Sequence, residues 1–189
     1  RDICDREQWL LMLDEIQTGN GRTGTYFAYQ HNDLLPDVVT TAKGLGNGVP
    51  ICACLVHGAA INVLQAGNHG STFGGNPLAC SAALAVVAEI EEAQLAKRAQ
   101  VLGDALLAGF REKLADCPYV RDIRGLGLMI GIELDEACGD LVGQAQNAGM
   151  LINVTAGNTV RLLPPLIFSD EQAQQLVNTL STLILSFKD

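Results

Sequence analysis

The sequence predicts an α/β fold, in which short apolar runs form strands and longer amphipathic segments form helices. Residues 9–13, 38–41 and 51–56 are apolar or β-branched runs bounded by polar residues, glycine or proline, a pattern typical of buried strands. Near the end of the chain, residues 173–187 carry an apolar stripe at helical spacing. This mixture of strand and helix patterns argues against an all-helical or an all-strand fold.

Size and composition are those of a globular protein. Of the 189 residues, 48% are hydrophobic and 17% are charged, which argues against intrinsic disorder. At about 100–200 residues per domain, the length allows one domain, or one and part of another. The net charge of −9 argues against nucleic acid or an anionic membrane as a partner, because phosphate binding needs clustered lysine and arginine. No apolar run reaches the ~18–20 residues that span a bilayer.

The first half is expected to begin inside a helix. Residues 1–6 carry neither an initiator Met nor a basic and apolar leader, so we expect them to belong to a longer chain. Residues 9–13 are expected to form a strand that is buried on both faces. A glycine-rich loop at 19–24 and one or two helical turns at 26–31 should connect it to the next two strands.

Two helices are expected in the middle of the chain. Asn76 and Pro77 mark a helix start, because Asn caps a helix and Pro is favoured at its first position. The Ala-rich run 78–93 should then form a buried helix. A second helix should follow, with an apolar stripe at i+4 spacing formed by Leu102, Leu106, Phe110 and Leu114.

The second half is expected to be a smaller α/β domain. Its expected strands are 119–124, 126–134, 151–154 and 159–163, and its expected helix is 138–148. A last helix should follow the capping box that Ser169 and Gln172 form. We therefore expect two domains, residues 1–97 and 98–189.

Two residues at strand ends could carry chemistry. Asp14 closes the first strand, and ligands of open α/β sheets lie beyond the carboxyl ends of strands, so Asp14 either meets a ligand or caps the next turn. Lys43 follows the second strand between Ala42 and Gly44, with no acid within five residues. Small apolar neighbours disfavour the charged amine and would make it a nucleophile toward carbonyls. The alternative is a surface lysine on a turn.

Other polar features leave alternatives open. Residues 19–24 match Gly-x-Gly-x-x-Gly, but a dinucleotide-binding fold is disfavoured, because the following helix is too short and the next strand ends in Lys43 instead of an acid. Residues 69–77, rich in glycine and hydroxyl groups, form either a phosphate site at a helix N-terminus or an ordinary turn with a cap. Arg161 lies alone in an apolar strand and should meet an anion, either a protein carboxylate or that of a ligand.

The cysteines show no sign of a metal site. None forms a Cys-x-x-Cys pair, and no Cys/His cluster has zinc spacing. Cys52 and Cys54 would share one face of a strand. We expect reduced thiols acting as small core residues in a cytoplasmic protein. The cysteines are Cys4, Cys52, Cys54, Cys80, Cys117 and Cys138.

Several motifs occur in an order that resembles one family. The first half carries LDEIQTGNGRTG at 13–24, AKGLG at 42–46 and STFGGNP at 71–77. The second half carries RGLGLMIG at 124–131 and NVTAGNTVRLLPPL at 153–166. Together they resemble the class III aminotransferases, which use pyridoxal 5′-phosphate (PLP), and the resemblance covers essentially the whole chain.

The resemblance implies a fold-type I PLP-dependent transferase. Residues 1–97 would be the C-terminal part of the large cofactor-binding domain, and residues 98–189 the small C-terminal domain. The chain is much shorter than members of this family, so it is expected to be their C-terminal portion. Without the N-terminal portion, some strand edges and apolar faces of this chain should be left uncovered. The isolated chain is also expected to be inactive.

Roles for the cofactor-binding residues follow from the same resemblance. Lys43 would bond to the cofactor aldehyde and later move a proton between Cα and C4′. Asp14 would pair with the protonated pyridine nitrogen, and Gln17 would hydrogen-bond near the phenolic oxygen. Ser71 and Thr72 would bind the phosphate of the cofactor in the neighbouring subunit.

The resemblance also implies a substrate class. Arg161 would help to hold a substrate carboxylate. A homodimeric enzyme would move an amino group from N-acetylornithine to 2-oxoglutarate, forming glutamate, in arginine biosynthesis. The alternatives are succinylornithine, succinyl-diaminopimelate, ornithine or 4-aminobutyrate as amine donor, or a non-catalytic truncated product.

Overall fold

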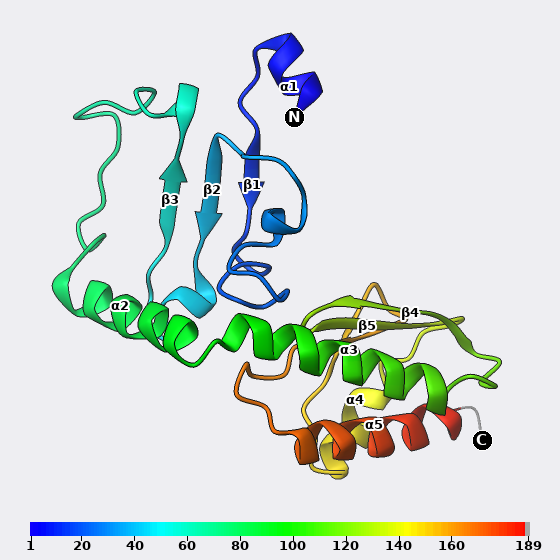
Figure 1. Cartoon of the computed structure of the whole chain (residues 1–189). Coiled ribbons are helices and arrows are strands. Elements are labelled where there is room, and N and C mark those ends of the chain that lie inside the picture. Colours follow the sequence, from blue (N-terminus) through cyan, green and yellow to red (C-terminus); the bar gives the residue numbers. More distant parts are fainter. Residues whose placement is uncertain (188–189) are drawn as a thin grey trace. The chain divides into compact units, whose positions relative to one another are not determined.

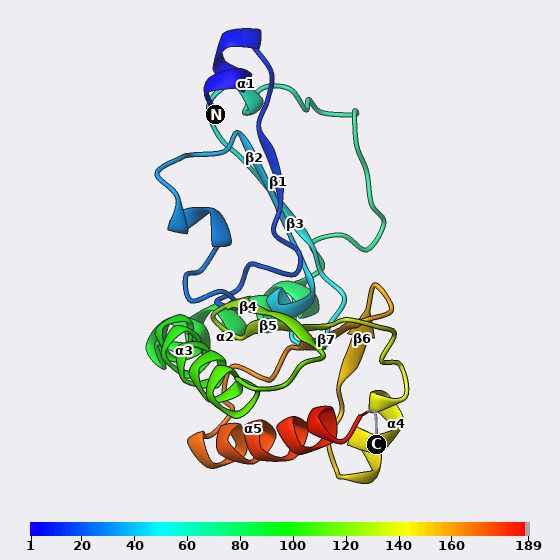
Figure 2. The same cartoon turned by 90° about the vertical axis from the view of Figure 1, so that its right-hand side faces the viewer.

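The computed structural model describes residues 1–187 and divides the chain into two compact units (Figures 1 and 2). The first unit is Arg1–Ala96, and the second begins at Lys97, one residue before the domain boundary expected from the sequence. Each unit contains its own sheet, with three strands in the first and four in the second. The mixed architecture confirms the expected α/β class.

The first unit is built on a mixed sheet in the order β1-β2-β3. Strand β1 runs parallel to β2, whereas β3 runs antiparallel to β2. Met12 pairs with Val38 and Asp14 with Thr40, so β1 and β2 end at the same edge of the sheet. The elements of this unit are α1 (Asp2–Glu7), β1 (Met12–Asp14), η1 (Ala28–His31), β2 (Val38–Thr41), η2 (Lys43–Leu45), β3 (Ala53–Val56), η3 (Gly58–Ala60) and α2 (Pro77–Glu92), where η denotes a 3₁₀ helix.

Asp37 ties the beginning of this unit together. Its Oδ2 accepts hydrogen bonds from the Arg1 guanidinium at 2.7 Å and from the Leu11 amide at 2.8 Å. These two bonds lower the pKa of Asp37, the Arg1 bond having the larger effect. The backbone amide of Asp37 in turn donates to the Leu11 carbonyl at 2.9 Å, which sets the start of β2 beside β1.

Strand β1 is exposed, so the expectation of a strand buried on both faces is wrong. Met12 is 62% exposed, and Trp9, just before the strand, is 63% exposed. The reason is that no helix of the described chain packs closely over β1, which is also an edge strand with only β2 beside it. The open edge and the uncovered apolar side chains agree with the expectation for a partial chain.

Helix α2 begins as expected but is not buried on all sides. The Asn76 carboxamide oxygen accepts the Ala79 amide at 3.0 Å, and Pro77 is the first helical residue. Leu78 and Leu84 are mostly exposed, which contradicts the expected buried helix. Only one side of the helix is buried, at Ala79, Ala83 and Ile90, and the helix contacts η2.

The second unit contains an antiparallel sheet in the order β4-β5-β7-β6. A tight turn with a positive φ of 55° at Gly127 joins the first two strands of this sheet. The elements of this unit are α3 (Leu95–Lys113), which begins at the end of the first unit, β4 (Val120–Leu126), β5 (Met129–Leu134), α4 (Leu141–Asn147), β6 (Asn153–Thr155), β7 (Thr159–Leu162) and α5 (Asp170–Leu185).

The core of this unit lies between the sheet and its helices (Figure 2). Phe110 of α3, Ile132 of β5 and Leu180 of α5 are completely buried there. The expected stripe is confirmed, since Leu102, Leu106 and Phe110 of α3 are buried, as is Leu114 directly after the helix. The capping box at Ser169 is also confirmed, because its hydroxyl accepts the Gln172 amide at 3.1 Å.

Some expected boundaries shift by a few residues. The helix expected at 138–148 begins at Leu141, because the residues before it form a turn in which the Leu141 amide donates to the Cys138 carbonyl. The strand expected at 151–154 begins at Asn153. Among the described residues, no helix is both long and apolar enough to cross a membrane.

The cysteines differ in their burial. All six are free thiols. Cys117 and Cys138 are buried in the second unit as small core residues, and burial raises the pKa of Cys138. Cys52 and Cys54 are exposed at β3, so the expectation of core packing is wrong for this pair. No metal-binding cluster of His, Cys, Asp and Glu occurs within residues 1–187.

Candidate functional site

Strands β1 and β2 end at the same edge of the first sheet (Figure 1), and Asp14 and Lys43 lie at or just beyond these ends. Asp14 ends β1 directly beside Thr40 of the parallel strand β2. Lys43 follows β2 as the first residue of η2. Since ligands of α/β sheets bind beyond the carboxyl ends of parallel strands, this edge is the candidate site.

Asp14 caps the turn that follows it and retains a free oxygen. Its Oδ1 accepts the Ile16 amide at 3.0 Å. Its Oδ2 has no hydrogen-bond partner among the described residues. Asp14 is exposed, whereas the sequence predicted the end of a buried strand; the difference arises because nothing in the described chain covers the outer side of β1. The free oxygen can therefore accept a hydrogen bond from a ligand.

Lys43 has an unusual backbone conformation and an exposed side chain. Its φ of 47° lies in the left-handed region, which residues other than glycine rarely adopt. Its amine forms no hydrogen bond or ion pair within the described chain, and it borders an open hollow lined also by Gly44, Pro50 and Ile51. The expected enclosure by small apolar groups is therefore wrong for the described chain, because Ala42 and Gly44 are too small to cover the amine.

Glu15 is a buried carboxylate that the sequence analysis did not single out. Only 3% of it is exposed. Its Oε1 accepts the Tyr29 amide at 2.8 Å, and its Oε2 accepts the Ala28 amide at 3.0 Å and the Thr18 hydroxyl. Glu15 thus closes the loop that follows Asp14 and caps η1. An acid directly after a predicted strand was the only signal for this role.

Asn20 joins the glycine-rich loop to the turn of Lys43. Its carboxamide Nδ2 donates to the Thr41 hydroxyl at 3.0 Å and to the Ala42 carbonyl at 3.2 Å. The Tyr26 hydroxyl donates to its Oδ1 at 3.5 Å, and burial raises the pKa of Tyr26. An Asn among glycines is a weak signal, so the sequence analysis missed this residue too.

The remaining cofactor candidates lie on two different loops. Gln17 is half-buried in the turn after β1, at the same edge as Asp14. Ser71 and Thr72 are exposed on the loop before α2, where the Ser71 hydroxyl accepts the Gly74 amide at 3.1 Å. No described hydrogen bond connects Ser71 or Thr72 to Asp14, Gln17 or Lys43.

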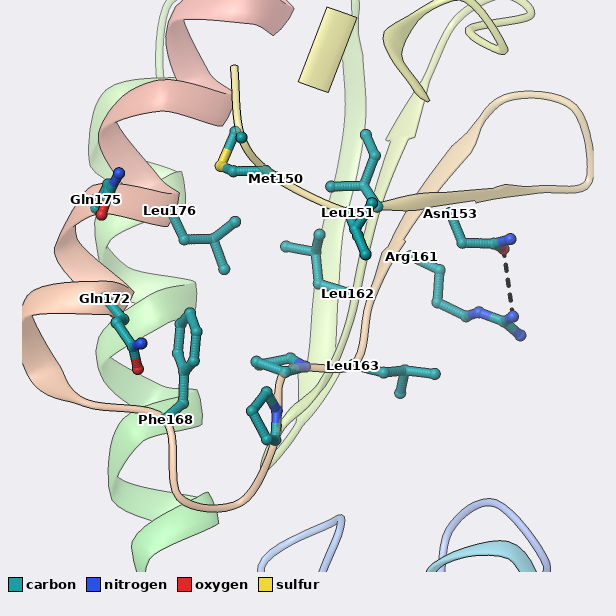
Figure 3. A pocket seen from close by; sticks show the side chains of 14 residues that line it. Met150, Leu151, Asn153, Arg161, Leu162, Leu163, Phe168, Gln172, Gln175 and Leu176 are labelled. Atoms are coloured by element: carbon teal, nitrogen blue, oxygen red, sulfur yellow. Dashed lines mark hydrogen bonds between the residues drawn. The ribbon is translucent and has the colours of Figure 1, made fainter. Parts of the chain in front are cut away.

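Arg161 lies in β7, in the second unit, on the sheet face opposite the core. Its neighbours in the strand, Val160 and Leu162, point into the core, so Arg161 points away from it. Its guanidinium donates to the Asn153 carboxamide oxygen at 3.3 Å (Figure 3), and its Nε is buried without a partner. No carboxylate of the described chain pairs with it, so a ligand anion is the better candidate partner.

A cavity of about 540 Å³ lies near Arg161 at one side of the second unit. Figure 3 shows Leu162, Phe168 and Leu176 around this hollow, with Gln172 toward one side. Arg161 extends away from the hollow toward Asn153. The lining is therefore mixed, with apolar side chains on one side and the polar side chains of Gln172 and Arg161 at its margins.

Known proteins resemble the chain in sequence and in structure. A sequence model of the family described as "Aminotransferase class-III" matches residues 1–184. The acetylornithine aminotransferase 1 of Bordetella pertussis is 53% identical over 99% of the chain, which spans 48% of that protein. The chain thus spans about half the length of the curated relatives it matches.

Solved structures give the same result. An ornithine aminotransferase from Toxoplasma gondii, with partial occupancy of PLP at its active site, superposes with a TM-score of 0.93, 36% identity, and coverage of 98% of this chain and 45% of that one. An acetylornithine aminotransferase from Elizabethkingia anophelis superposes with a TM-score of 0.91 at 32% identity, covering 98% and 48%. The family match and these likenesses show that the chain belongs to the class III aminotransferases, which are PLP-dependent enzymes.

Proposed function

We propose that this chain supplies the catalytic lysine and part of the cofactor site of an acetylornithine aminotransferase. The observation that carries the proposal is the meeting of Asp14 and Lys43 at one edge of adjacent parallel strands. The similarity to the Bordetella pertussis relative supports the choice of reaction. In this proposal, residues 1–97 are the C-terminal part of the cofactor-binding domain, and the remainder is the small domain.

The groups at this edge fit the chemistry of PLP. Lys43 offers a primary amine without a partner in the described chain, and Asp14 offers an unoccupied carboxylate oxygen. A carboxylate beside a pyridine nitrogen favours the protonated form of that nitrogen, because the two opposite charges attract. When bound, the cofactor supplies an electron sink for negative charge at the substrate Cα.

Each residue then has a distinct task. Lys43 Nζ would hold the cofactor through its aldehyde, with loss of water, and the free amine would serve as the base and acid that moves a proton between the substrate Cα and C4′. Asp14 Oδ2 would accept a hydrogen bond from the protonated ring nitrogen, and Gln17 would donate to the phenolic oxygen. Ser71 and Thr72 would donate to the phosphate of a cofactor in a second subunit, and their position on an exposed loop supports that assignment.

Arg161 is proposed to bind a substrate carboxylate. Its buried and unpartnered Nε, together with the absence of a described acidic partner, supports this task. The proposed amine donor is N-acetylornithine and the acceptor 2-oxoglutarate, which becomes glutamate, in a cytoplasmic homodimer that serves arginine biosynthesis. The likeness to the Toxoplasma gondii enzyme favours ornithine as the second candidate donor.

Trapping the cofactor tests the lysine assignment. The chain is mixed with PLP, reduced with borohydride and digested, and the modified lysine is located by mass spectrometry. We expect Lys43 to be labelled in preference to Lys97, Lys113 and Lys188. Equal labelling of all four lysines would contradict the proposed cofactor site in this chain.

A chimera tests the reaction. The chain is joined to the N-terminal half of the Bordetella pertussis relative, and turnover is measured with N-acetylornithine and with ornithine. We expect N-acetylornithine to be preferred, and Lys43→Ala to lower turnover by about 10³-fold, as expected when the proton-transferring group is lost. The exposed Lys97→Ala serves as the matched control. Normal turnover by Lys43→Ala would overturn the proposal.

A further inference from the structure

The turn that presents Lys43 needs an external restraint. Lys43 has a φ of 47°, a conformation that is unfavourable for a side chain with a Cβ. The 3₁₀ turn η2 is short, closed by the Leu45 amide to the Ala42 carbonyl at 3.0 Å and by the Gly46 amide to the Lys43 carbonyl at 3.2 Å. Short 3₁₀ turns have poor hydrogen-bond geometry, so such a turn alone does not maintain one orientation of Lys43.

Asn20 supplies this restraint from a distant segment. It is 6% exposed, and its carboxamide holds the residues on the N-terminal side of Lys43, namely the Thr41 hydroxyl and the Ala42 carbonyl. The Ala42 carbonyl therefore accepts hydrogen bonds from both the Asn20 carboxamide and the Leu45 amide, so the bond from Asn20 fixes the same oxygen that closes the turn. On the C-terminal side, a Cβ built at Gly44 would lie 3.4 Å from the Asn20 Cβ, which places Asn20 against the turn itself.

The orientation of the Asn20 carboxamide is itself determined. The Tyr26 hydroxyl donates to Oδ1, which leaves Nδ2 facing Thr41 and Ala42. Thr41 is only 3% exposed, so its hydroxyl has little access to water as a replacement partner. Asn20 has a φ of 57°, which Asn tolerates better than most residues, so its backbone suits the position as well.

From these contacts we infer that Asn20 is a positioning residue for Lys43: it holds the left-handed turn from which the Lys43 side chain extends. The inference rests on the proposed role of Lys43 as the residue that bonds to the cofactor. Asn20 does not touch the reacting atoms and acts through the backbone of Ala42. Its loss should therefore change where the amine points, while the sheet stays intact.

Two variants of the full chain separate the side chain from the backbone. Asn20→Asp keeps the shape of the side chain but replaces the Nδ2 donor with a carboxylate oxygen. This oxygen is repelled by the Ala42 carbonyl, because both are acceptors. Asn20→Gly keeps the left-handed backbone and removes the carboxamide. Thr41→Val removes one acceptor only. Asn32→Asp, an exposed position in the same unit, is the matched control.

The first readout is hydrogen exchange of the Leu45 and Gly46 amides, which needs no cofactor. We expect exchange there to rise about tenfold in both Asn20 variants, a size that corresponds to the loss of one buried hydrogen bond. Exchange in β2 should stay near that of the wild-type chain. A uniform rise through the whole first unit would instead show a merely structural role and overturn the inference.

The second readout is the ratio of Lys43 to Lys97 labelling by PLP and borohydride. We expect this ratio to fall in Asn20→Asp and Asn20→Gly and to stay unchanged in Asn32→Asp. If wild-type Lys43 is not preferred, the proposed function fails, and the exchange measurement still decides whether Asn20 holds the turn. If Lys43 is preferred and the Asn20 variants match the wild-type chain in both readouts, the inference on Asn20 is wrong. Should Asn20→Asp fail to fold, Asn20→Gly and Thr41→Val decide between these outcomes.

Discussion

Replacement of Glu15 by alanine should loosen the loop beside the candidate site. The carboxylate is 3% exposed and accepts the Ala28 and Tyr29 amides and the Thr18 hydroxyl. A hydrogen bond to a charged group contributes about 1.5–3 kcal/mol. Ala28 and Tyr29 are half-buried, so water partly replaces the carboxylate and the lower end of that range applies.

The hydrogen bonds from these two amides together then contribute about 3 kcal/mol to the free energy of unfolding. The Thr18 hydroxyl adds little, because it can rotate to another partner. Glu15→Gln keeps one carbonyl oxygen as an acceptor, so it should lose about half of this contribution to the free energy of unfolding. The exposed Glu92→Ala, at the end of α2, is the control and should change stability by less than about 0.5 kcal/mol.

Urea denaturation measures the loss in unfolding free energy, and hydrogen exchange locates it. In Glu15→Ala, the Ala28 and Tyr29 amides should exchange at least about tenfold faster, since 1.4 kcal/mol corresponds to a factor of about ten. The reasoning is refuted if both amides keep the wild-type exchange rate, because the carboxylate would then not be their acceptor in solution. It is equally refuted if Glu15→Gln loses more stability than Glu15→Ala.

Two further predictions concern the stability of the separate units. The lowered pKa of Asp37 means that its carboxylate stabilises the first unit above the ordinary aspartate pKa and stops doing so as the pH falls through the lowered value. The difference in melting temperature between the wild-type chain and Asp37→Asn should thus be present at pH 7 and vanish in acid; a constant difference would contradict it. Phe110→Ala should cost the second unit about 3–5 kcal/mol in urea denaturation, because Phe110 is fully buried, whereas the exposed Val101→Ala on the same helix should cost less than about 0.5 kcal/mol. A small loss for Phe110→Ala would contradict the core described above.

The sequence by itself determined the features that depend on neighbouring residues. The apolar stripe of α3, the Asn76-Pro77 helix start and the Ser169 capping box follow from spacing and from side chains a few residues apart, and all are present in the structure. The same local logic predicted the strands that end at Asp14 and shortly before Lys43. The order of the motifs, also a property of the sequence alone, was sufficient to predict the family.

Only the tertiary structure decided how exposed the site is and what holds it. Strand β1 and helix α2 were expected to be buried, but burial depends on which segments cover them, and local apolar periodicity carries no information about that. Asn20 contacts Thr41 and Ala42, and Glu15 contacts Ala28 and Tyr29, across loops that have no periodic pattern. Hydrogen bonds between segments far apart in the chain are set by chain reversal and register, and these become visible only once the parallel pairing of β1 with β2 is known.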